Sequence, residues 1–150
     1  MNKIALFSGR FDPIHLGHII TIGRLLEKYQ MVIVCILDYP ERETCSIDKN
    51  IEILTEFKRL WCHGRWRVLI TANTTHFAHI TIDAIDRICK GVCCDVEDVV
   101  YVGGNEKVNK HIKSIGFPVE YIERSYFYRA TSIRETLAKG RTIKDILKYE

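Results

Sequence analysis

The sequence predicts an α/β fold built on a five-stranded, mostly parallel sheet of the doubly wound, Rossmann-like kind. Two observations predict it. Short runs rich in β-branched residues alternate with longer segments that have the apolar period of a helix. The chain has 150 residues, of which 47% are hydrophobic, and this size fits one buried core. We therefore expect a single domain over residues 1–150.

Five segments are predicted strands because they are short, apolar and followed by turn residues or by a segment of helical period. In order, they are Lys3–Ser8, Met31–Leu37, Trp66–Thr71, Val99–Gly103 and Val119–Ile122. The predicted helices between them are Gly17–Tyr29, Ile47–Cys62, His76–Cys89 and Glu106–Ile115. Two further helices, Thr131–Lys139 and Ile143–Lys148, follow the last strand.

Local signals mark three of the helix ends. Ser46 and Thr75 are predicted N-caps of the second and third helices, since a hydroxyl there accepts a hydrogen bond from a free backbone N–H. Gly116-Phe117-Pro118 ends the fourth helix before the last strand. Ligands of doubly wound sheets bind at the carboxyl ends of the strands, near the point where the strand order reverses. The residues after the first, fourth and fifth strands are therefore the candidate site.

Charge and composition narrow the class of protein. The formal net charge of +3 arises from 22 basic and 19 acidic residues, a balance too even to indicate binding of long nucleic acid. No apolar run approaches the length of a membrane span, and the residues after Met1 do not form a secretory signal. We expect a cytoplasmic protein that binds neither nucleic acid nor a membrane; a homo-oligomer is compatible with the sequence.

The six cysteines are expected to be reduced thiols in that compartment, with Cys35 a small core residue within an apolar strand. A zinc site is the alternative, but no pair has the Cys-x-x-Cys spacing of a zinc ribbon. That site would use Cys62, His63, Cys89, Cys93 and Cys94. We therefore expect no protein-bound structural metal.

The first predicted strand leads into Ser8-Gly9-Arg10-Phe11-Asp12-Pro13-Ile14-His15-Leu16-Gly17-His18 and then into an amphipathic helix. A loop that opens a helix offers free backbone N–H groups and the positive end of a dipole to a phosphate. Gly9 and Gly17 let the backbone approach a ligand, and His15 and His18 add two donors three positions apart. A lone histidine at such a place is more often a cap or a solvated side chain.

The pattern Gly-x-Phe-x-Pro-x-His-x-Gly-His just after an N-terminal strand resembles the HxGH nucleotidylyltransferase superfamily at every defining position. The resemblance implies an enzyme that transfers a nucleoside monophosphate from a triphosphate to a phosphorylated substrate and releases pyrophosphate. It also implies that His15 and His18 contact the α-phosphate, with Arg10 and Phe11 beside them. The acceptor is a phosphate monoester, largely dianionic at neutral pH, so no general base is required.

A second stretch, Tyr128-Arg129-Ala130-Thr131-Ser132-Ile133-Arg134, opens another predicted helix. By itself such a cap is usually structural. It resembles the superfamily's late element that binds the triphosphate tail, with Arg129 standing where a small hydroxyl residue is usual. The resemblance implies that Arg134, Thr131, Ser132 and Arg129 hold the β- and γ-phosphates, and that Mg²⁺ is carried on the triphosphate rather than in a protein cage.

Within the superfamily, Pro13 and the pair Gly9-Arg10 resemble adenylyltransferases of pyridine nucleotides, and His15 differs from the threonine usual in phosphopantetheine adenylyltransferase. The chain is most like archaeal-type nicotinamide-mononucleotide adenylyltransferase, an enzyme of NAD biosynthesis. This implies ATP as donor, nicotinamide or nicotinate mononucleotide as acceptor, and a base and ribose site at Gly103, Gly104 and Asn105.

The acceptor side is less clearly marked. The tryptophan that stacks on nicotinamide in those enzymes is absent, and Phe77 is the nearest candidate, although an apolar residue on a helix is more often core. Arg42 and Lys49 are candidates for the acceptor phosphate, with a solvated surface role as the alternative for each. Asp38 leaves open a cytidylyltransferase that uses CTP and a phosphoalcohol such as glycerol 3-phosphate. A non-catalytic nucleotide sensor of the same fold is the second alternative.

Overall fold

The computed structural model describes residues 3–38, 46–62 and 68–123, with the backbone alone for residues 59–62. Its five strands form one sheet in the order β3-β2-β1-β4-β5, and all four neighbouring pairs are parallel. This confirms the predicted Rossmann-like fold class. The strands are β1 (Ile4–Gly9), β2 (Met31–Leu37), β3 (Val68–Asn73), β4 (Val99–Gly103) and β5 (Val119–Tyr121).

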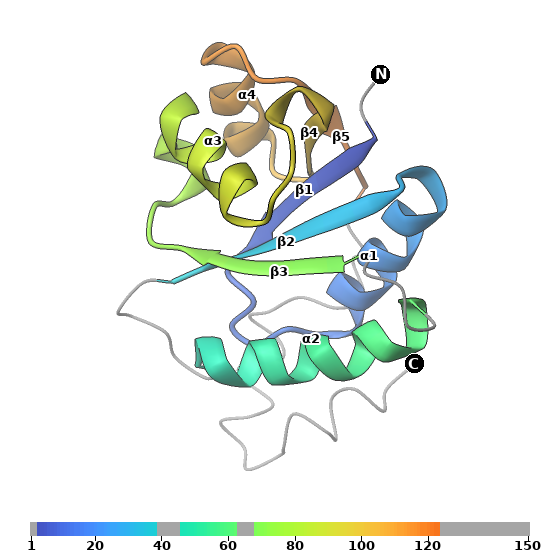
Figure 1. The fold of residues 1–150 in the computed structure, drawn as a ribbon. Helices are drawn as coiled ribbons and strands as arrows, with labels where there is room; N and C mark the ends of the chain where they lie inside the picture. Colours follow the sequence, from blue (N-terminus) through green and yellow to red (C-terminus); the bar gives the residue numbers. More distant parts are fainter. Residues whose placement is uncertain (1–2, 39–45, 63–67, 124–150) are drawn as a thin grey trace.

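Helices cover both faces of this sheet, as Figure 1 shows. On one face lie α1 (Leu16–Lys28) and α2 (Ile47–Cys62), and on the other lie α3 (Ile82–Gly91) and α4 (Glu106–Ser114). Two short 3-10 helices, η1 (Phe77–His79) and η2 (Val96–Asp98), precede α3 and β4. Parallel strands need such crossover helices, and the helices bury the sheet on both sides.

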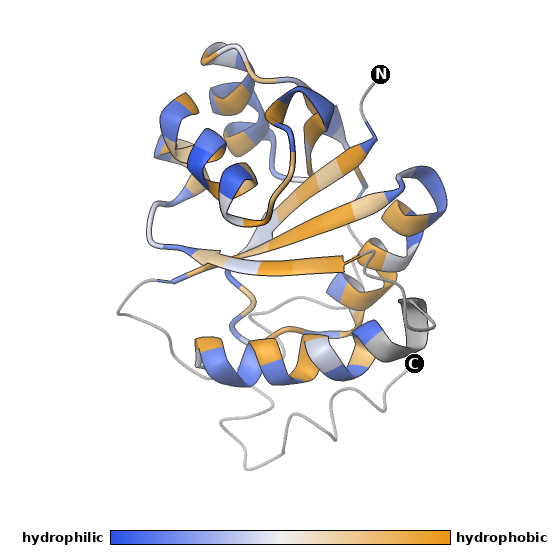
Figure 2. Ribbon diagram, in the orientation of Figure 1, coloured by the Kyte–Doolittle hydropathy of each residue, from blue (hydrophilic) through white to orange (hydrophobic). Residues whose placement is uncertain are grey.

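The core consists of two apolar layers, one on each face of the sheet. The layer under α1 and α2 includes Val34 and Ile22, and the layer under α3 and α4 includes Ile33 and Ile85. Figure 2 shows the strands as the most hydrophobic part of the fold and the outer helix surfaces as mixed. Cys35 is fully buried in β2, as predicted, and its thiol is free.

The predicted third helix is wrong in its first part. Instead of one helix over residues 76–89, the chain forms η1, in which Phe77 is buried, and then α3. Thr75 is not the cap: Thr81 Oγ1 accepts a hydrogen bond from the Ala84 N–H at 3.2 Å and starts α3. The backbone is extended at Ile80 and Thr81, and this separates η1 from α3.

Other boundaries agree with the predictions more closely. Ser46 caps α2 as predicted, with its Oγ 3.1 Å from the Lys49 nitrogen. The turn after α4 contains Gly116 at φ 89°, a left-handed conformation that glycine adopts without strain. Strand β3 ends two residues later than predicted, and the first two residues of the predicted strand, like the two predicted C-terminal helices, lie outside the described residues.

The strand order reverses at β1, which has β2 on one side and β4 on the other. Near this point Ser8 Oγ and the Tyr101 hydroxyl form a hydrogen bond of 2.8 Å that joins β1 to β4. No helix in the described part of the chain is both long enough and apolar enough to cross a membrane. The carboxyl ends of β1 and β4 are therefore the place to look for a ligand site.

Candidate active site

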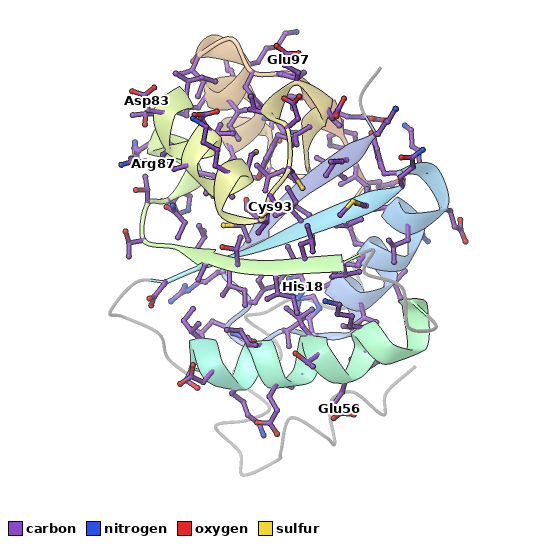
Figure 3. The ribbon with its side chains drawn as sticks, viewed as in Figure 1. His18, Glu56, Asp83, Arg87, Cys93 and Glu97 are labelled. Carbon is purple, nitrogen blue, oxygen red and sulfur yellow. The ribbon has the colours of Figure 1, made fainter. Side chains whose placement is uncertain are left out.

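The loop between β1 and α1, residues 10–15, leaves the carboxyl end of the central strand at the point where the strand order reverses. It presents two histidines, His15 as the N-cap of α1 and His18 in the first turn. Figure 3 shows His18 on the side of the sheet that α1 and α2 cover. The structure thus places the predicted pair at the predicted edge of the sheet.

His15 and His18 cap the start of α1 reciprocally. Nδ1 of His15 accepts a hydrogen bond from the Gly17 N–H at 3.1 Å, and Nδ1 of His18 accepts one from the His15 N–H at 3.1 Å. The two rings are stacked, with centroids 3.7 Å apart. Because Nδ1 of each ring is an acceptor, a neutral ring has its proton on Nε2. In each neutral ring the N–H is therefore at Nε2.

The His15 side chain is held in its neutral form. Burial lowers the pKa of His15 to about 4, because desolvation disfavours the charged imidazolium. His15 is 5% exposed. Two imidazolium rings at the observed stacking distance would repel, so a neutral His15 also permits the pair to stack. The stacked pair thus consists of a neutral, buried His15 and the neighbouring His18 ring.

We expected the backbone N–H groups at the start of α1 to bind phosphate as well. Several of them already have partners, since the Gly17 N–H bonds to the His15 ring and those of His18 and Ile19 bond to the His15 carbonyl at 3.0 and 3.2 Å. The Gly17 carbonyl accepts a hydrogen bond from the Thr21 hydroxyl at 2.9 Å. These three amides are therefore already used within the protein.

Phe11 turns the chain at the start of the loop and supports His18. Its backbone has φ 46°, in the left-handed region that is uncommon for a residue with a side chain. Its ring is 1% exposed and meets the His18 ring edge-on, with centroids 4.6 Å apart. A Cβ on Gly9 would lie 3.0 Å from the Phe11 ring. Gly9 and Phe11 thus shape the loop, and the Phe11 ring is not open to a nucleotide.

Asp12 is buried in the loop and forms an ion pair with Arg10 at 3.6 Å. A buried carboxylate that is paired with arginine does not suit a Mg²⁺ ion. Within the described segments, no three side chains of the metal-binding types lie together in a way that could hold a metal ion. The side chains of Cys62 and His63, part of the alternative zinc set, lie outside the described residues.

Asn50 is a site residue that we did not predict. It lies on α2, is fully buried, and its amide bonds to the loop at two places: Nδ2 donates to the Phe11 carbonyl, and Oδ1 accepts from the Ile14 N–H at 3.1 Å. One signal was present in the sequence. Asn50 occupies the apolar stripe of α2, one turn before Leu54, where an amide is costly unless it is hydrogen-bonded.

The end of β4 forms the other half of the edge. Asn109 of α4 donates through Nδ2 to the Gly103 carbonyl at 2.8 Å, and a Cβ on Gly103 would lie 2.8 Å from both Asn109 Oδ1 and the Tyr101 ring. Packing within the protein therefore explains Gly103, which we had expected to allow approach of a base. Asn105 caps α4 through a hydrogen bond from the Val108 N–H at 3.2 Å. Gly104 lies between them and is half-buried.

Replacing Gly103 by alanine should destabilise the protein by about 1–3 kcal/mol, because the new methyl group must displace the Asn109 amide or the Tyr101 ring. The free energy of unfolding from denaturant titration measures this. Gly91→Ala is the matched control, since a Cβ there meets nothing within 4 Å. Equal stability of the two variants would show that the space at Gly103 is not needed.

A basic group lies at the same edge, on η1 and the first turn of α4. The rings of His76 and His79 are 6.3 Å apart. Burial lowers the pKa of His76, and the positive charges of His79 and Lys107 lower it further. Phe77, the candidate for stacking on an acceptor, is instead 1% exposed and packs on Tyr101 with ring centroids 5.5 Å apart. This placement favours a core role for Phe77.

A model of cytidylyltransferase-like proteins matches residues 6–136. The chain belongs to the cytidylyltransferase-like family. Its relatives include a phosphopantetheine adenylyltransferase from Nautilia profundicola, 19% identical over 150 residues that cover 97% of this chain and 87% of that protein. Another, from Gloeothece citriformis, is 39% identical over 54 residues, which are 35% of this chain and 34% of that protein. The prediction of a nucleotidylyltransferase is confirmed.

Two solved structures have folds similar to that of this chain. A bifunctional NMN adenylyltransferase/ADP ribose pyrophosphatase from Francisella tularensis, in complex with AMP and a manganese ion, has a TM-score of 0.71 and 19% identity. The match covers 98% of this chain but only 44% of that protein. A Vibrio parahaemolyticus protein assigned as a nicotinate-nucleotide adenylyltransferase has a TM-score of 0.60 and 21% identity, with 99% and 94% of the two chains covered.

The remaining predicted site residues divide into two groups. Lys49 is exposed in the first turn of α2 and lies 3.4 Å from Glu52, as expected for a solvated surface lysine. Five others lie outside the described residues, although the family match extends over them. These are Arg42, Arg129, Thr131, Ser132 and Arg134.

Proposed function

We propose that the protein transfers AMP from ATP to a phosphorylated acceptor, with nicotinamide or nicotinate mononucleotide as the first candidate. The observation that supports this most directly is the stacked His15–His18 pair, whose Nδ1 atoms are occupied by the backbone of α1. Their Nε2–H groups suit the α-phosphate because a neutral imidazole can donate a hydrogen bond to the phosphate oxygens without transferring its proton. The adenylyltransferases among the relatives support ATP as the donor.

In this reaction an oxygen of the acceptor phosphate attacks the α-phosphorus of ATP. A bond between that oxygen and phosphorus forms, the bond from phosphorus to the β-bridging oxygen breaks, and pyrophosphate leaves with the electron pair. The work of the protein is to align two anions and stabilise the charge on the α-phosphate. His15 and His18 supply the donors, and Arg134, Thr131, Ser132 and Arg129 are proposed to hold the tail. Mg²⁺ bound to the triphosphate would offset part of its charge.

The acceptor is proposed to lie between the histidine loop and η1, where Lys107 adds positive charge and His76, whose pKa is lowered, adds a largely neutral imidazole. That charge supports an acceptor with a negative group, and therefore nicotinate mononucleotide as well as nicotinamide mononucleotide. A second candidate acceptor is phosphopantetheine, because the matching curated relatives are phosphopantetheine adenylyltransferases. His15 argues against phosphopantetheine as the acceptor, whereas these relatives argue for it.

Release of pyrophosphate tests the proposal. ATP and CTP are each mixed with nicotinamide mononucleotide, nicotinate mononucleotide, phosphopantetheine and glycerol 3-phosphate. We expect turnover with ATP and one of the first three acceptors. CTP with glycerol 3-phosphate as the only active pair would establish the cytidylyltransferase alternative, and no activity together with nucleotide binding would establish the sensor.

Nucleotide choice also predicts a difference in thermal stability. A ligand that binds only the folded state raises the melting temperature in proportion to the logarithm of its concentration over its Kd. A site that forms hydrogen bonds with one base is left with unpaired groups by the wrong base, so ATP should give a clearly larger shift than CTP at equal concentration. Equal shifts would indicate that the site does not select the base.

A further inference from the structure

We propose that Asn50 is a positioning residue, which fixes the loop that presents His15 and His18 to the α-phosphate. This rests on the proposed function, because the transfer step is what gives the position of the two imidazoles its importance. Asn50 itself lies on α2, in a different crossover from the loop, and does not belong to either motif recognised in the sequence.

The two hydrogen bonds of Asn50 span the loop. Nδ2 donates to the carbonyl of Phe11 at the start of the loop, and Oδ1 accepts from the N–H of Ile14 near its end. One planar amide thus sets the separation of two backbone groups that flank Asp12 and Pro13. Because both partners are backbone atoms, the contact fixes the path of the chain rather than one rotamer.

The loop needs such restraints because of the backbone conformation of Phe11. Phe11 adopts φ 46°, which is unfavourable for a residue with a Cβ and persists only where the surroundings hold it. The Phe11 ring is held by packing against Phe7, whose ring centroid lies 5.9 Å away. The Phe11 carbonyl is held by Asn50. Loss of the amide removes the second of these restraints.

The loop transmits this position to both histidines. Ile14 precedes His15, so the Ile14 N–H bond to Asn50 lies one residue from the cap of α1. The Phe11 ring lies against His18, with centroids 4.6 Å apart. A loop that is free to move would therefore shift both imidazole donors relative to the sheet. In reactions that depend on alignment, a displacement on the order of 1 Å can lower turnover about a hundredfold.

Packing alone does not explain an asparagine at this place. Position 50 faces the apolar layer under α2, where a leucine would bury more apolar surface. An amide there is tolerated only because its donor and acceptor are both satisfied. The groups that it satisfies belong to the histidine loop.

The first experiment compares Asn50→Leu with Tyr29→Phe. Tyr29 is buried at the other end of α1 and its hydroxyl donates to Glu120, so its loss removes a buried polar contact without touching the loop. We expect Asn50→Leu to lower kcat at least tenfold while the Kd for ATP changes less than threefold. Tyr29→Phe should lower only the melting temperature. Unchanged kcat in Asn50→Leu, measured on folded protein, overturns the proposal.

The second variant, Asn50→Asp, tests the two hydrogen bonds of Asn50 through the pH dependence of kcat. A carboxylate accepts from the Ile14 N–H but cannot donate to the Phe11 carbonyl, whereas the protonated acid does both. The charged and titratable groups of the loop and α1 around it are Arg10, Asp12, His15 and His18. We expect kcat relative to the native protein to rise as the pH falls from 8 to 5.5, and Asn50→Leu to show no such recovery. A constant ratio for Asn50→Asp contradicts the donor role.

A third readout does not depend on activity. In the native protein the buried His15 ring should not titrate above pH 5 in a histidine NMR titration, since its pKa is lowered to about 4. In Asn50→Leu, a displaced loop exposes the ring and its pKa should move toward the ordinary value. If no acceptor supports turnover but this shift occurs, the proposed function fails and the positioning by Asn50 stands. An unchanged titration of His15 overturns the positioning.

Discussion

Replacing His18 by alanine should lower kcat at least a hundredfold, which corresponds to about 2.7 kcal/mol of lost transition-state stabilisation. The physical reason is the loss of the donor that we propose His18 supplies to the α-phosphate. Steady-state kinetics of pyrophosphate release measure the effect. The variant also loses the hydrogen bond between His18 Nδ1 and the His15 N–H, so turnover must be expressed per folded molecule.

A second histidine variant serves as the control for this experiment. His111 lies in α4, and its Nε2 is hydrogen-bonded to the Ile80 carbonyl at 2.8 Å, away from the loop. His111→Gln should keep kcat within about twofold, because the glutamine amide can donate to the Ile80 carbonyl in place of the ring and does not contact the histidine loop. Near-normal turnover in His18→Ala would remove this side chain from the transfer step.

The buried His15 should make the protein less stable in mild acid. Its pKa lies at about 4 in the folded state and near 6.5 in the unfolded chain, so the unfolded state binds the proton more tightly. The stabilisation is complete above pH 6.5 and is lost as the pH falls toward 4, with no further loss below that. From this group alone we expect the free energy of unfolding to fall by about 3 kcal/mol between pH 7 and pH 4.

The variant His15→Asn separates this effect from the other titrating groups. Asparagine is a good N-cap, so its side-chain oxygen can replace Nδ1 as the acceptor of the Gly17 N–H. The difference in unfolding free energy between native protein and variant should depend on pH only between about 6.5 and 4. Parallel curves over that interval would mean that His15 is protonated as readily in the folded protein as in the unfolded chain.

The centre of the sheet could be predicted from the sequence because β2, β1 and β4 are buried on both faces and have few polar interruptions. Met31–Leu37 and Val99–Gly103 have the predicted bounds for this reason. The segment after β3 could not be predicted, because its apolar residues fit a helical period whether or not the helix is continuous. Whether Phe77 and Ile80 pack on the sheet or continue a helix depends on α4 and β4, which are distant in the sequence.

Some residues of the candidate site could be predicted from the sequence and others could not. His15 and His18 could be found because they belong to one contiguous motif and lie on the element that the motif predicts. For Asn50 the sequence shows only a polar residue on the apolar stripe of α2, and not its hydrogen bonds to a loop that lies far away in the chain. A cap was the alternative role for a lone histidine here, and both rings do cap α1, but the spacing of the motif does not show which ring nitrogen bonds to the backbone.

The central position of β1 has a consequence for the growing chain on the ribosome. Ile4 lies opposite both Met31 and Val99, so one neighbour of β1 is made early and the other late. Strands β1, β2 and β3 are consecutive and can assemble with α1 and α2 as soon as they emerge. Until β4 is synthesised, the other edge of β1 remains an unpaired row of backbone groups on an apolar strand. Such edges pair readily with other chains, so the half-made sheet is open to aggregation until β4 covers this edge.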